Sequence, residues 1–460
     1  MPDPTEPINV VVLGAGFAGL NFARKFKARH DASGRPIRLT LIDKQNHHLF
    51  QPLLYQVATA ALAAPEVAAP TRAMFRKQRN VEIVMDVVDS IDVVNKKVCC
   101  SLEDYPYDHL VIGLGGRTSY YGHDEWEEFA PGLKTLADAF RIRKKMLTAF
   151  ERAEVTDDPD EKRRLMRTVV VGGGPTGVEL AGAMADLTRQ VWSKDFRNID
   201  IEDAHIMLVD VMDRVLTPYP PKLSESAQKQ LESMGVEVRF NTKVVDIKKH
   251  RVWLEGPDGE VVTHGAGTIL WGGGVQGADA LATMEGVELD RGGRVIVEPD
   301  LSVPGHPEVI CLGDAAHVKQ ADGRPVPGVA PAAMQMGNYA AKWLNRQITG
   351  KAETRPDFSY TDKGSMAVIG RSKAVANLFN RLPLTGFSAW MAWMLIHLLF
   401  LVGFRSKVVT LIQWVYQYVT LRSGARIIAD ADRPDPGVYD ILRDADAKVS
   451  SEPTPLSKSA

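Results

Sequence analysis

Two short glycine-rich segments have the spacing that binds the pyrophosphate of a dinucleotide. In the first, the apolar run at residues 8–13 leads directly into a GxGxxG pattern and then into a helix-compatible stretch. The first glycine makes a tight turn, the second lets the backbone approach a phosphate, and the third lets helix and strand pack closely. The helix N-terminus then faces the phosphate. The residues predicted to form this cradle are Gly14, Ala15, Gly16, Phe17, Ala18 and Gly19.

An acidic residue follows where such a motif requires one. The second apolar run, residues 38–42, ends at Asp43, which is expected to accept a hydrogen bond from a ribose hydroxyl. Strand, glycines, helix, strand and acid in this order favour a dinucleotide site over the alternative, a glycine-rich loop in an unrelated α/β fold. Lys44, Val88 and Gly115 are assigned to the same site.

The same pattern recurs in the middle of the chain. A strand predicted at residues 168–171 precedes a second glycine motif, and another at residues 205–209 ends at Asp210. A carboxylate there would bind a free 2′-hydroxyl and repel a 2′-phosphate, so we expect NADH to be preferred over NADPH. The longer gap before Asp210 implies an inserted loop around residues 193–203. The residues predicted to form this cradle are Gly172, Gly174, Pro175, Thr176, Gly177 and Asp210.

Two cradles in one chain predict hydride transfer from a nicotinamide to a flavin. A Rossmann unit that binds FAD, with a second unit for NADH inserted in it, brings the two reactive rings together. GTILWGGG at residues 267–274 is similar to the strand that closes a nicotinamide unit, and VICLGD at residues 309–314 to the strand that returns to the FAD unit. Gly273, Gly313 and Asp314 are therefore assigned to cofactor binding. Asp314 would contact the ribityl chain or phosphate of FAD, and its alternative role is a helix N-cap.

The composition sets the class of protein. The chain has 460 residues, 45% hydrophobic and 24% charged, as in a globular protein of two or three domains. A formal net charge of −2 gives no basic field for nucleic acid. Cys99, Cys100 and Cys311 form neither a CxxC pair nor a metal-ligand spacing, so we expect no disulfide framework, no metal site and a reducing compartment. The acidic N-terminus does not resemble a signal peptide, which favours a cytoplasmic protein core.

The region after residue 370 differs from the rest of the chain. Residues 371–429 contain no Asp or Glu but seven Lys or Arg. Within them, residues 387–404 carry no formal charge and would make a helix of about 27 Å, just short of a hydrocarbon core of roughly 30 Å. The tail at residues 430–460, rich in Asp, Pro, Ser and Lys, is predicted to be disordered.

A second helix in this region is predicted to be amphipathic. Residues 408–421 place Thr410, Gln413, Gln417 and Thr420 on one helical stripe, with apolar side chains around the rest. Tryptophans, tyrosines and bases suit the interface of a membrane with anionic head groups. We interpret the region as an interfacial membrane anchor. A true membrane span and a dimer or core-packing surface are the alternatives.

Several segments together resemble one family, the type II NADH:quinone oxidoreductases, which are single-subunit respiratory enzymes that pump no protons. The resemblance extends to about residue 429 and implies FAD and NADH as cofactors and a membrane quinone as electron acceptor. The similar segments are HHLFQPLLYQVATAAL from His47, DHLVIGLGGRTSYYG from Asp108, LWGGGVQG from Leu270, VICLGDAAH from Val309, VPGVAPAAMQMGNYAA from Val326 and YTDKGSMAVIGR from Tyr360.

The resemblance implies three catalytic residues. Glu179 matches a family glutamate near the nicotinamide and the quinone, although a carboxylate at a helix N-terminus is also simply favourable. Gln335 matches the second glutamine of a quinone-site segment whose first glutamine is replaced here by Pro331, and a helix start alone is the other interpretation. Lys363 resembles a family lysine beside the flavin that could stabilise developing negative charge, and a surface lysine is the alternative.

Other flavoproteins of this fold fit less well. A disulfide reductase needs a cysteine pair beside the flavin, whereas Cys99 and Cys100 are adjacent in a predicted strand and point to opposite faces. A sulfide:quinone oxidoreductase also needs reactive cysteines, and Cys311 lies in a strand that should be buried. A regulatory flavoprotein would have no reason to carry the C-terminal region in this form.

We therefore predict an α/β protein with two Rossmann-type dinucleotide-binding domains, similar to pyridine nucleotide-disulfide reductases, plus C-terminal membrane-anchoring helices. It would be a monotopic enzyme on the cytoplasmic side of the cell inner membrane, in contact with lipids, and a homodimer is possible. Residues 133–154 are expected to form a connecting helix. The predicted divisions are 1–118 and 291–350 for FAD, 119–290 for NADH, 351–429 for the anchor and 430–460 for the tail.

Overall fold

The protein is described from a computed structural model, and residues up to 425 form one compact unit. The predicted tail at residues 430–460 lies outside the described residues, as does part of the predicted loop at residues 193–203. The structure describes residues 6–191, 196–320, 322–420 and 427–428.

A six-stranded sheet forms the first half of this unit. Its central strand β1 (Ile8–Leu13) pairs in parallel with β2 (Ile37–Asp43) and with β9 (His109–Ile112). These strands are nearly continuous apolar runs, as expected where both faces of a parallel sheet are covered. In the order β20-β21-β9-β1-β2-β5, the outer strands are β20 (Ser302–Val303), β21 (His306–Cys311) and β5 (Val81–Met85).

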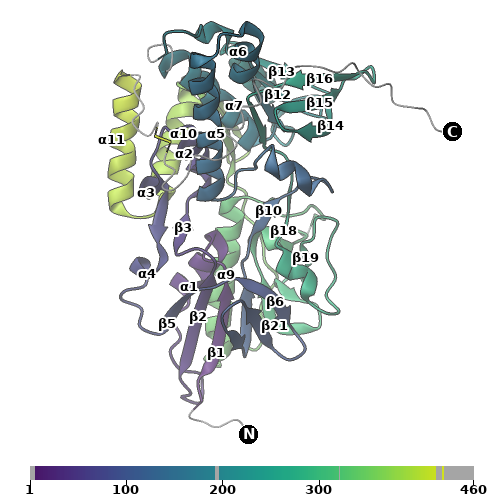
Figure 1. Cartoon of the computed structure of the whole chain (residues 1–460). Helices are drawn as coiled ribbons and strands as arrows, with labels where there is room; N and C mark the ends of the chain where they lie inside the picture. Colours follow the sequence, from purple (N-terminus) through teal and green to yellow (C-terminus); the bar gives the residue numbers. More distant parts are fainter. Residues whose placement is uncertain (1–5, 192–195, 321, 421–426, 429–460) are drawn as a thin grey trace, which may run out of the picture. The chain divides into compact units, whose positions relative to one another are not determined.

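Two helices cross closely beside this sheet, α1 (Phe17–Lys25) and α9 (Ala330–Ile348), as Figure 1 shows. Gly337 lies at the crossing, where a Cβ would come within 2.3 Å of the carbonyl oxygen of Ala18. The glycine that ends the resembling segment APAAMQMG is therefore required by helix packing.

A second parallel sheet forms the other half. Its order is β13-β12-β11-β17, so β11 (Thr168–Val171) lies between β12 (Ile206–Val209) and β17 (Thr268–Trp271). The sheet carries helix α7 (Pro175–Asp186), which follows β11 as α1 follows β1. The remaining elements are β13 (Val236–Arg239), α8 (Pro221–Glu232) and the antiparallel β14 (Lys243–Lys248), β15 (Arg251–Glu255) and β16 (Val261–Gly265).

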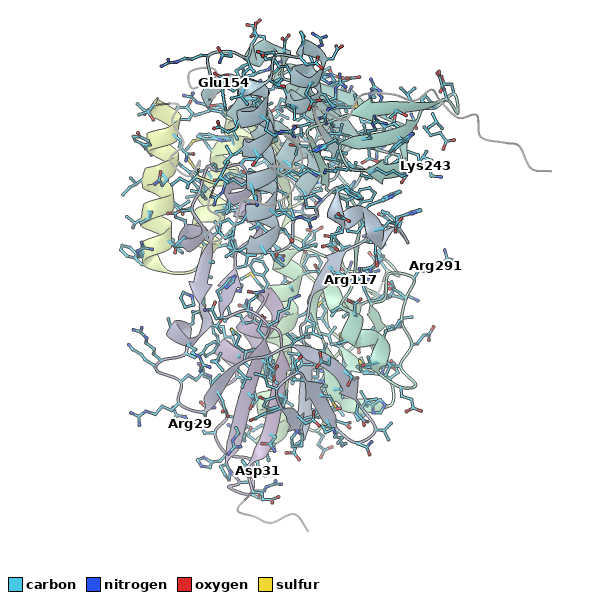
Figure 2. All side chains as sticks on the ribbon, in the orientation of Figure 1. Arg29, Asp31, Arg117, Glu154, Lys243 and Arg291 are labelled. Carbon is cyan, nitrogen blue, oxygen red and sulfur yellow. The ribbon has the colours of Figure 1, made fainter. Side chains whose placement is uncertain are left out.

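The chain crosses between the two halves on a short antiparallel pair, β10 (Gly116–Thr118) with β18 (Val275–Gly277). Arg117 of β10 donates from Nε to the carboxylate of Asp279 at 2.8 Å, and Figure 2 shows it at the level between the halves. The predicted connecting helix is present as α5 (Leu136–Val155), whose N-cap is Thr135.

The predicted domain divisions remain predictions, but the packing bears on one of them. Leu281 and Met284 belong to the apolar core of the first half, together with strands β1 and β9. This packing favours a boundary near residue 275 rather than 290, because residues 275–284 lie with the FAD-binding strands.

The C-terminal region begins with a three-stranded sheet that packs on α7. It consists of β23 (Gly364–Gly370), β24 (Lys373–Leu378) and β25 (Leu382–Thr385). Gly182 of α7 permits the contact, since a Cβ there would lie 1.6 Å from the carbonyl oxygen of Ile369.

Two helices follow, α10 (Gly386–Phe400) and α11 (Phe404–Thr420), and α11 packs against α10 and α3 (Ala64–Val67) (Figure 1). Both predicted helices are thus present. In the part of the chain that the structure describes, no helix combines the length and apolar character needed to cross a bilayer.

Candidate active site

The first cradle shows which glycines the protein itself requires. Gly14 has a φ of +91°, and a Cβ there would lie 2.3 Å from the carbonyl oxygen of Gly113. A Cβ on Gly19 would lie 1.9 Å from the carbonyl oxygen of Gly14. Gly16 is different, because its φ is −70° and a Cβ would meet no protein atom within 4 Å. That open space, at the N-terminus of α1, suits the pyrophosphate of FAD.

The second cradle repeats this geometry. Gly172 has a φ of +103°, and a Cβ on Gly177 would lie 1.8 Å from the carbonyl oxygen of Gly172. Gly174 has a φ of −72° and again no protein atom within 4 Å of a Cβ. Both loops therefore keep a glycine that only a close ligand would require, at the N-terminus of a helix in each case.

The two predicted ribose acids also make equivalent contacts. Asp43 accepts the N–H of Ala15 at 2.6 Å and that of Gln45 at 2.7 Å, and burial raises its pKa. Asp210 accepts the N–H of Gly173 and, at 2.7 Å, that of Met212. Each carboxylate thus fixes its glycine loop at the carboxyl edge of its sheet, where nucleotides bind in such folds.

No arginine in the described structure turns toward Asp210 from the adjacent strand end. Arg239, the last residue of β13, instead donates from Nε to Glu237 at 2.6 Å and contacts His264 at 3.0 Å. A 2′-phosphate would therefore meet a carboxylate with no guanidinium to neutralise it. This arrangement supports the expected preference for NADH.

The remaining predicted cofactor residues lie at the ends of strands or in the first turns of helices. Lys44 is exposed directly after β2, and Val88 begins β6 (Val88–Asp92). Phe17, Ala18, Pro175 and Thr176 lie in the first turns of α1 and α7. Three glycines adopt or flank turns after strands: Gly115, with a φ of +70°, Gly273, and Gly313, with a φ of +66°.

Asp314 lies in a 3-10 turn at the end of β21 rather than at an α-helix N-cap. It faces Lys134, whose pKa is lowered by burial and raised by the charge of Asp314. A half-buried lysine within range of the charge of this carboxylate, in the segment that leads into α5, was not predicted from the sequence.

His48 is a second residue that the sequence reasoning missed. It is buried, and its Nδ1 lies 2.8 Å from the carbonyl oxygen of Ala15 in the first glycine loop. Its ring packs edge-on against Phe17. The signal for it in the sequence was its place in the resembling segment HHLFQPLLYQVATAAL from His47.

A cavity of about 180 Å³ connects the second half to the C-terminal helices. Its polar lining comes from α2 (Leu54–Ala58), from α7, from Arg371 after β23 and from Gln417 of α11, and its outer wall is aromatic. The lining residues used below are Tyr55, Gln56, Glu179, Asp186, Trp393 and Trp414.

Glu179 is the predicted catalytic residue that this cavity contains. It lies beyond the first turn of α7, which holds no acidic residue, so a helix N-terminus does not explain its presence. Burial raises the pKa of Glu179 to about 8, although the N–H of Val368 donates to it and lowers the pKa. Asp186, seven residues later on α7, also lines the cavity, and burial raises its pKa to about 6. Two carboxyls near neutrality in one cavity can hold and release protons at physiological pH.

The other two predicted catalytic residues lie elsewhere, close to one another in the chain's fold. The side-chain amide of Gln335 donates to the carbonyl oxygen of Thr361 at 2.9 Å and accepts the N–H of Thr361 at 3.0 Å. It therefore anchors the segment that carries Lys363, which is exposed. Pro331 occupies the first turn of α9, where its missing N–H costs nothing. Neither Gln335 nor Lys363 lines the cavity that holds Glu179.

Two Rossmann units with equivalent glycine loops define a flavoprotein of the two-dinucleotide class. Residues 8–337 match the family of pyridine nucleotide-disulphide oxidoreductases. The thiols argue against disulfide chemistry in this chain: Cys311 is buried, and burial raises the pKa of Cys100 to about 12.

Sequence comparison narrows the class. The chain is 41% identical over 437 residues to the type II NADH:quinone oxidoreductase Ndh of Mycobacterium tuberculosis, covering 93% of this chain and 91% of that one. It belongs to the family of type II NADH:quinone oxidoreductases.

Solved structures share the fold. NDH2 from Plasmodium falciparum, solved with NADH, superposes with a TM-score of 0.83 at 19% identity, over 92% of this chain and all of that one. The sulfide:quinone oxidoreductase of Aquifex aeolicus superposes less well, with a TM-score of 0.67 at 16% identity, over 90% of this chain and 95% of that one.

Proposed function

We propose that the protein oxidises NADH and reduces a membrane quinone by way of bound FAD, without pumping protons. The observation that carries this proposal is the pair of matched cradles, each with one glycine, Gly16 or Gly174, that only a ligand would require. When bound, FAD would take a hydride from NADH and return two electrons to the quinone. The first unit holds FAD, and the second holds NADH.

The chain's own residues contribute the binding and the proton chemistry. Asp43 and Asp210 fix the loops that bind the two pyrophosphates. Glu179 supplies a carboxyl in the cavity between α7 and the C-terminal helices. Gln335 holds the segment of Lys363, whose cation would stabilise negative charge on the reduced flavin.

The membrane contact is assigned to the outer faces of α10 and α11. On α10, exposed apolar side chains recur every four residues, and α11 exposes further ones along its length. Such a continuous apolar surface is unusual on a protein in water and suits insertion into the interfacial region of a bilayer. The exposed residues include Phe387, Met391, Leu395, Leu399, Phe404, Val408, Ile412, Val415 and Val419.

We assign this surface to lipid on the cytoplasmic side of the inner membrane, from which a quinone could reach the cavity behind it. The alternative occupant is a second copy of the chain. Vesicle co-sedimentation and sedimentation equilibrium in detergent distinguish the two, because a lipid surface binds vesicles as a monomer and a dimer surface need not bind them at all.

A matched pair of variants tests the main proposal. Gly16→Val should yield protein without flavin absorbance, because the side chain fills the space for the FAD pyrophosphate. Gly174→Val should keep its flavin, and dithionite should reduce it, while NADH should not. The proposal is wrong if NADH reduces the Gly174→Val flavin at the wild-type rate, or if NADH-reduced wild-type protein passes no electrons to a quinone.

A further inference from the structure

A chain of hydrogen bonds runs from the C-terminal helix α11 to a tyrosine inside the cavity. Trp414 of α11 donates from Nε1 to Oε1 of Gln56 at 2.8 Å. Gln56 in turn donates from Nε2 to the hydroxyl oxygen of Tyr55 at 2.7 Å. All three side chains line the cavity, and each is less than a tenth exposed.

The order of donors in this chain is fixed by chemistry. An indole N–H can only donate, so the carboxamide of Gln56 must turn its oxygen toward Trp414. Its NH₂ group must then face Tyr55, whose hydroxyl oxygen accepts. The hydroxyl hydrogen of Tyr55 is not used in this contact, because the hydroxyl accepts from Gln56, and it is available to donate.

The cavity is the direction that remains for this hydrogen. Glu179 lines the same cavity, and after burial its negative charge is the largest cause that raises the pKa of Tyr55 well above the ordinary value. Tyr55 therefore stays protonated and can serve as a donor over the whole physiological pH range.

We propose that Tyr55 donates its hydroxyl hydrogen to an oxygen of the bound quinone, and that Gln56 and Trp414 are positioning residues that hold this hydroxyl in the donating orientation. This inference rests on the proposed function. It assigns a proton-donating role to Tyr55, which lies in the resembling segment from His47 but was not among the predicted catalytic residues, and it gives α11 a part in the chemistry.

The step balances with what the reaction supplies. A quinone takes up two electrons and two protons to become a quinol. NADH supplies two electrons and one proton as hydride, and the second proton comes from water. Tyr55 passes its proton to one quinone oxygen and regains one from the carboxyl of Glu179, which is replenished by solvent. The sum is NADH + H⁺ + quinone → NAD⁺ + quinol, with Tyr55 and Glu179 unchanged.

Two tryptophans allow a matched test. Trp393 and Trp414 both line the cavity with ring centroids 5.6 Å apart, but Nε1 of Trp393 is buried without a hydrogen-bond partner among the described residues. Trp414→Phe therefore removes a hydrogen bond, whereas Trp393→Phe removes none. Each changes the cavity wall by a similar volume.

The measurement is the reoxidation of NADH-reduced holoenzyme by a short-chain benzoquinone, in H₂O and in D₂O. Quinone affinity is measured separately by quenching of the cavity tryptophans in the oxidised enzyme. Tyr55→Phe should slow reoxidation by about 10²-fold, as expected for loss of a general acid. It should also lower the solvent isotope effect, because one of the two proton transfers to the quinone no longer goes through Tyr55, while reduction by NADH keeps its rate.

Substitution of either positioning residue should slow reoxidation by quinone less than Tyr55→Phe does. Trp414→Phe lets the amide of Gln56 rotate and should slow reoxidation about two- to tenfold, in line with one lost hydrogen bond. Gln56→Met, which removes both amide contacts, should do the same if Trp414→Phe fails to fold. Trp393→Phe should alter quinone affinity but keep the wild-type isotope effect.

Two results would overturn the inference. One is a Tyr55→Phe enzyme with wild-type reoxidation and an unchanged isotope effect. The other is a Trp393→Phe enzyme with the same reoxidation rate and the same isotope effect as Trp414→Phe. Altered packing of the cavity wall would then explain the slower reoxidation without the hydrogen bond. Failure of the proposed function is distinct, because wild-type enzyme reduced by NADH would then not react with quinone at all.

Discussion

Replacing Glu179 by glutamine should change how the protein's stability depends on pH. Burial raises the pKa of this carboxyl from the ordinary 4.5 to about 8. Between these pH values the folded protein holds one proton more than the unfolded chain, so its free energy of unfolding falls as the pH rises. One pH unit corresponds to about 1.4 kcal/mol, and the whole interval to about 5 kcal/mol at most.

Glutamine removes this contribution because it does not titrate. Relative to wild type, Glu179→Gln should therefore gain stability steadily from pH 5 to pH 8, with the largest gain at the upper end. The assay is thermal unfolding of the FAD-loaded, detergent-solubilised protein at pH 5, 6.5 and 8. Each value is compared as the difference between variant and wild type, which cancels the titration of the other groups.

Glu225→Gln provides the matched control. Glu225 lies exposed on α8 in an ion pair with Lys229, and its substitution should leave the pH dependence close to that of wild type. If Glu179→Gln shows the same difference from wild type at all three pH values, the carboxyl is ionised in the folded protein throughout. The reasoning from burial would then be wrong, and so would a proton-holding role in the cavity.

Three other predictions concern Asp186, Asp210 and the exposed apolar face of α10 and α11. Asp186→Asn should also gain stability relative to wild type as the pH rises, but only up to about pH 6. A gain in stability that continues to pH 8 would contradict the pKa that burial gives Asp186. Asp210→Ser should lower the ratio of kcat/KM for NADH to kcat/KM for NADPH by about tenfold. If the wild-type enzyme uses NADPH as well as NADH, the argument from Asp210 is wrong. Leu395→Glu with Ile412→Glu should release the enzyme from anionic vesicles, whereas 1 M salt should not release wild type, because apolar burial outweighs screened charge.

The cradles were predictable because their geometry is local. Turn, phosphate approach and helix packing each depend on residues within one short segment, so the glycine spacing alone specified them. The contacts of Asp43 and Asp210 link residues that are only about thirty to forty positions apart, through a strand order that Rossmann units share. For the same reason the helices α5, α10 and α11 agree with the periodicity of their sequences.

The cavity was not predictable in this way. Its lining combines α2, α7, β23 and the two C-terminal helices, which are separated by hundreds of residues and meet only through tertiary packing. Glu179 was identified by resemblance. Tyr55 lies in the resembling segment from His47 but was not assigned a catalytic role, and Asp186 carried no local signal. For Gln335 the resemblance indicated a substrate contact, but the structure shows its amide bonded to the backbone of Thr361.

The orientation of α11 was the least predictable feature, because an amphipathic pattern does not say which face turns inward. Here the polar stripe faces the protein: Thr410 is buried, and Gln417 donates to the carbonyl oxygen of Ala61. The apolar side of the helix is the exposed one, with Ile412 and Val419 more than half accessible. In water this arrangement leaves apolar side chains exposed, so they contribute no free energy of burial. Against lipid the same side chains are buried, which is favourable. The opposite face carries Trp414 and forms a wall of the cavity. In the proposed arrangement one helix would therefore contact the bilayer and also orient Tyr55 toward the quinone that comes from it.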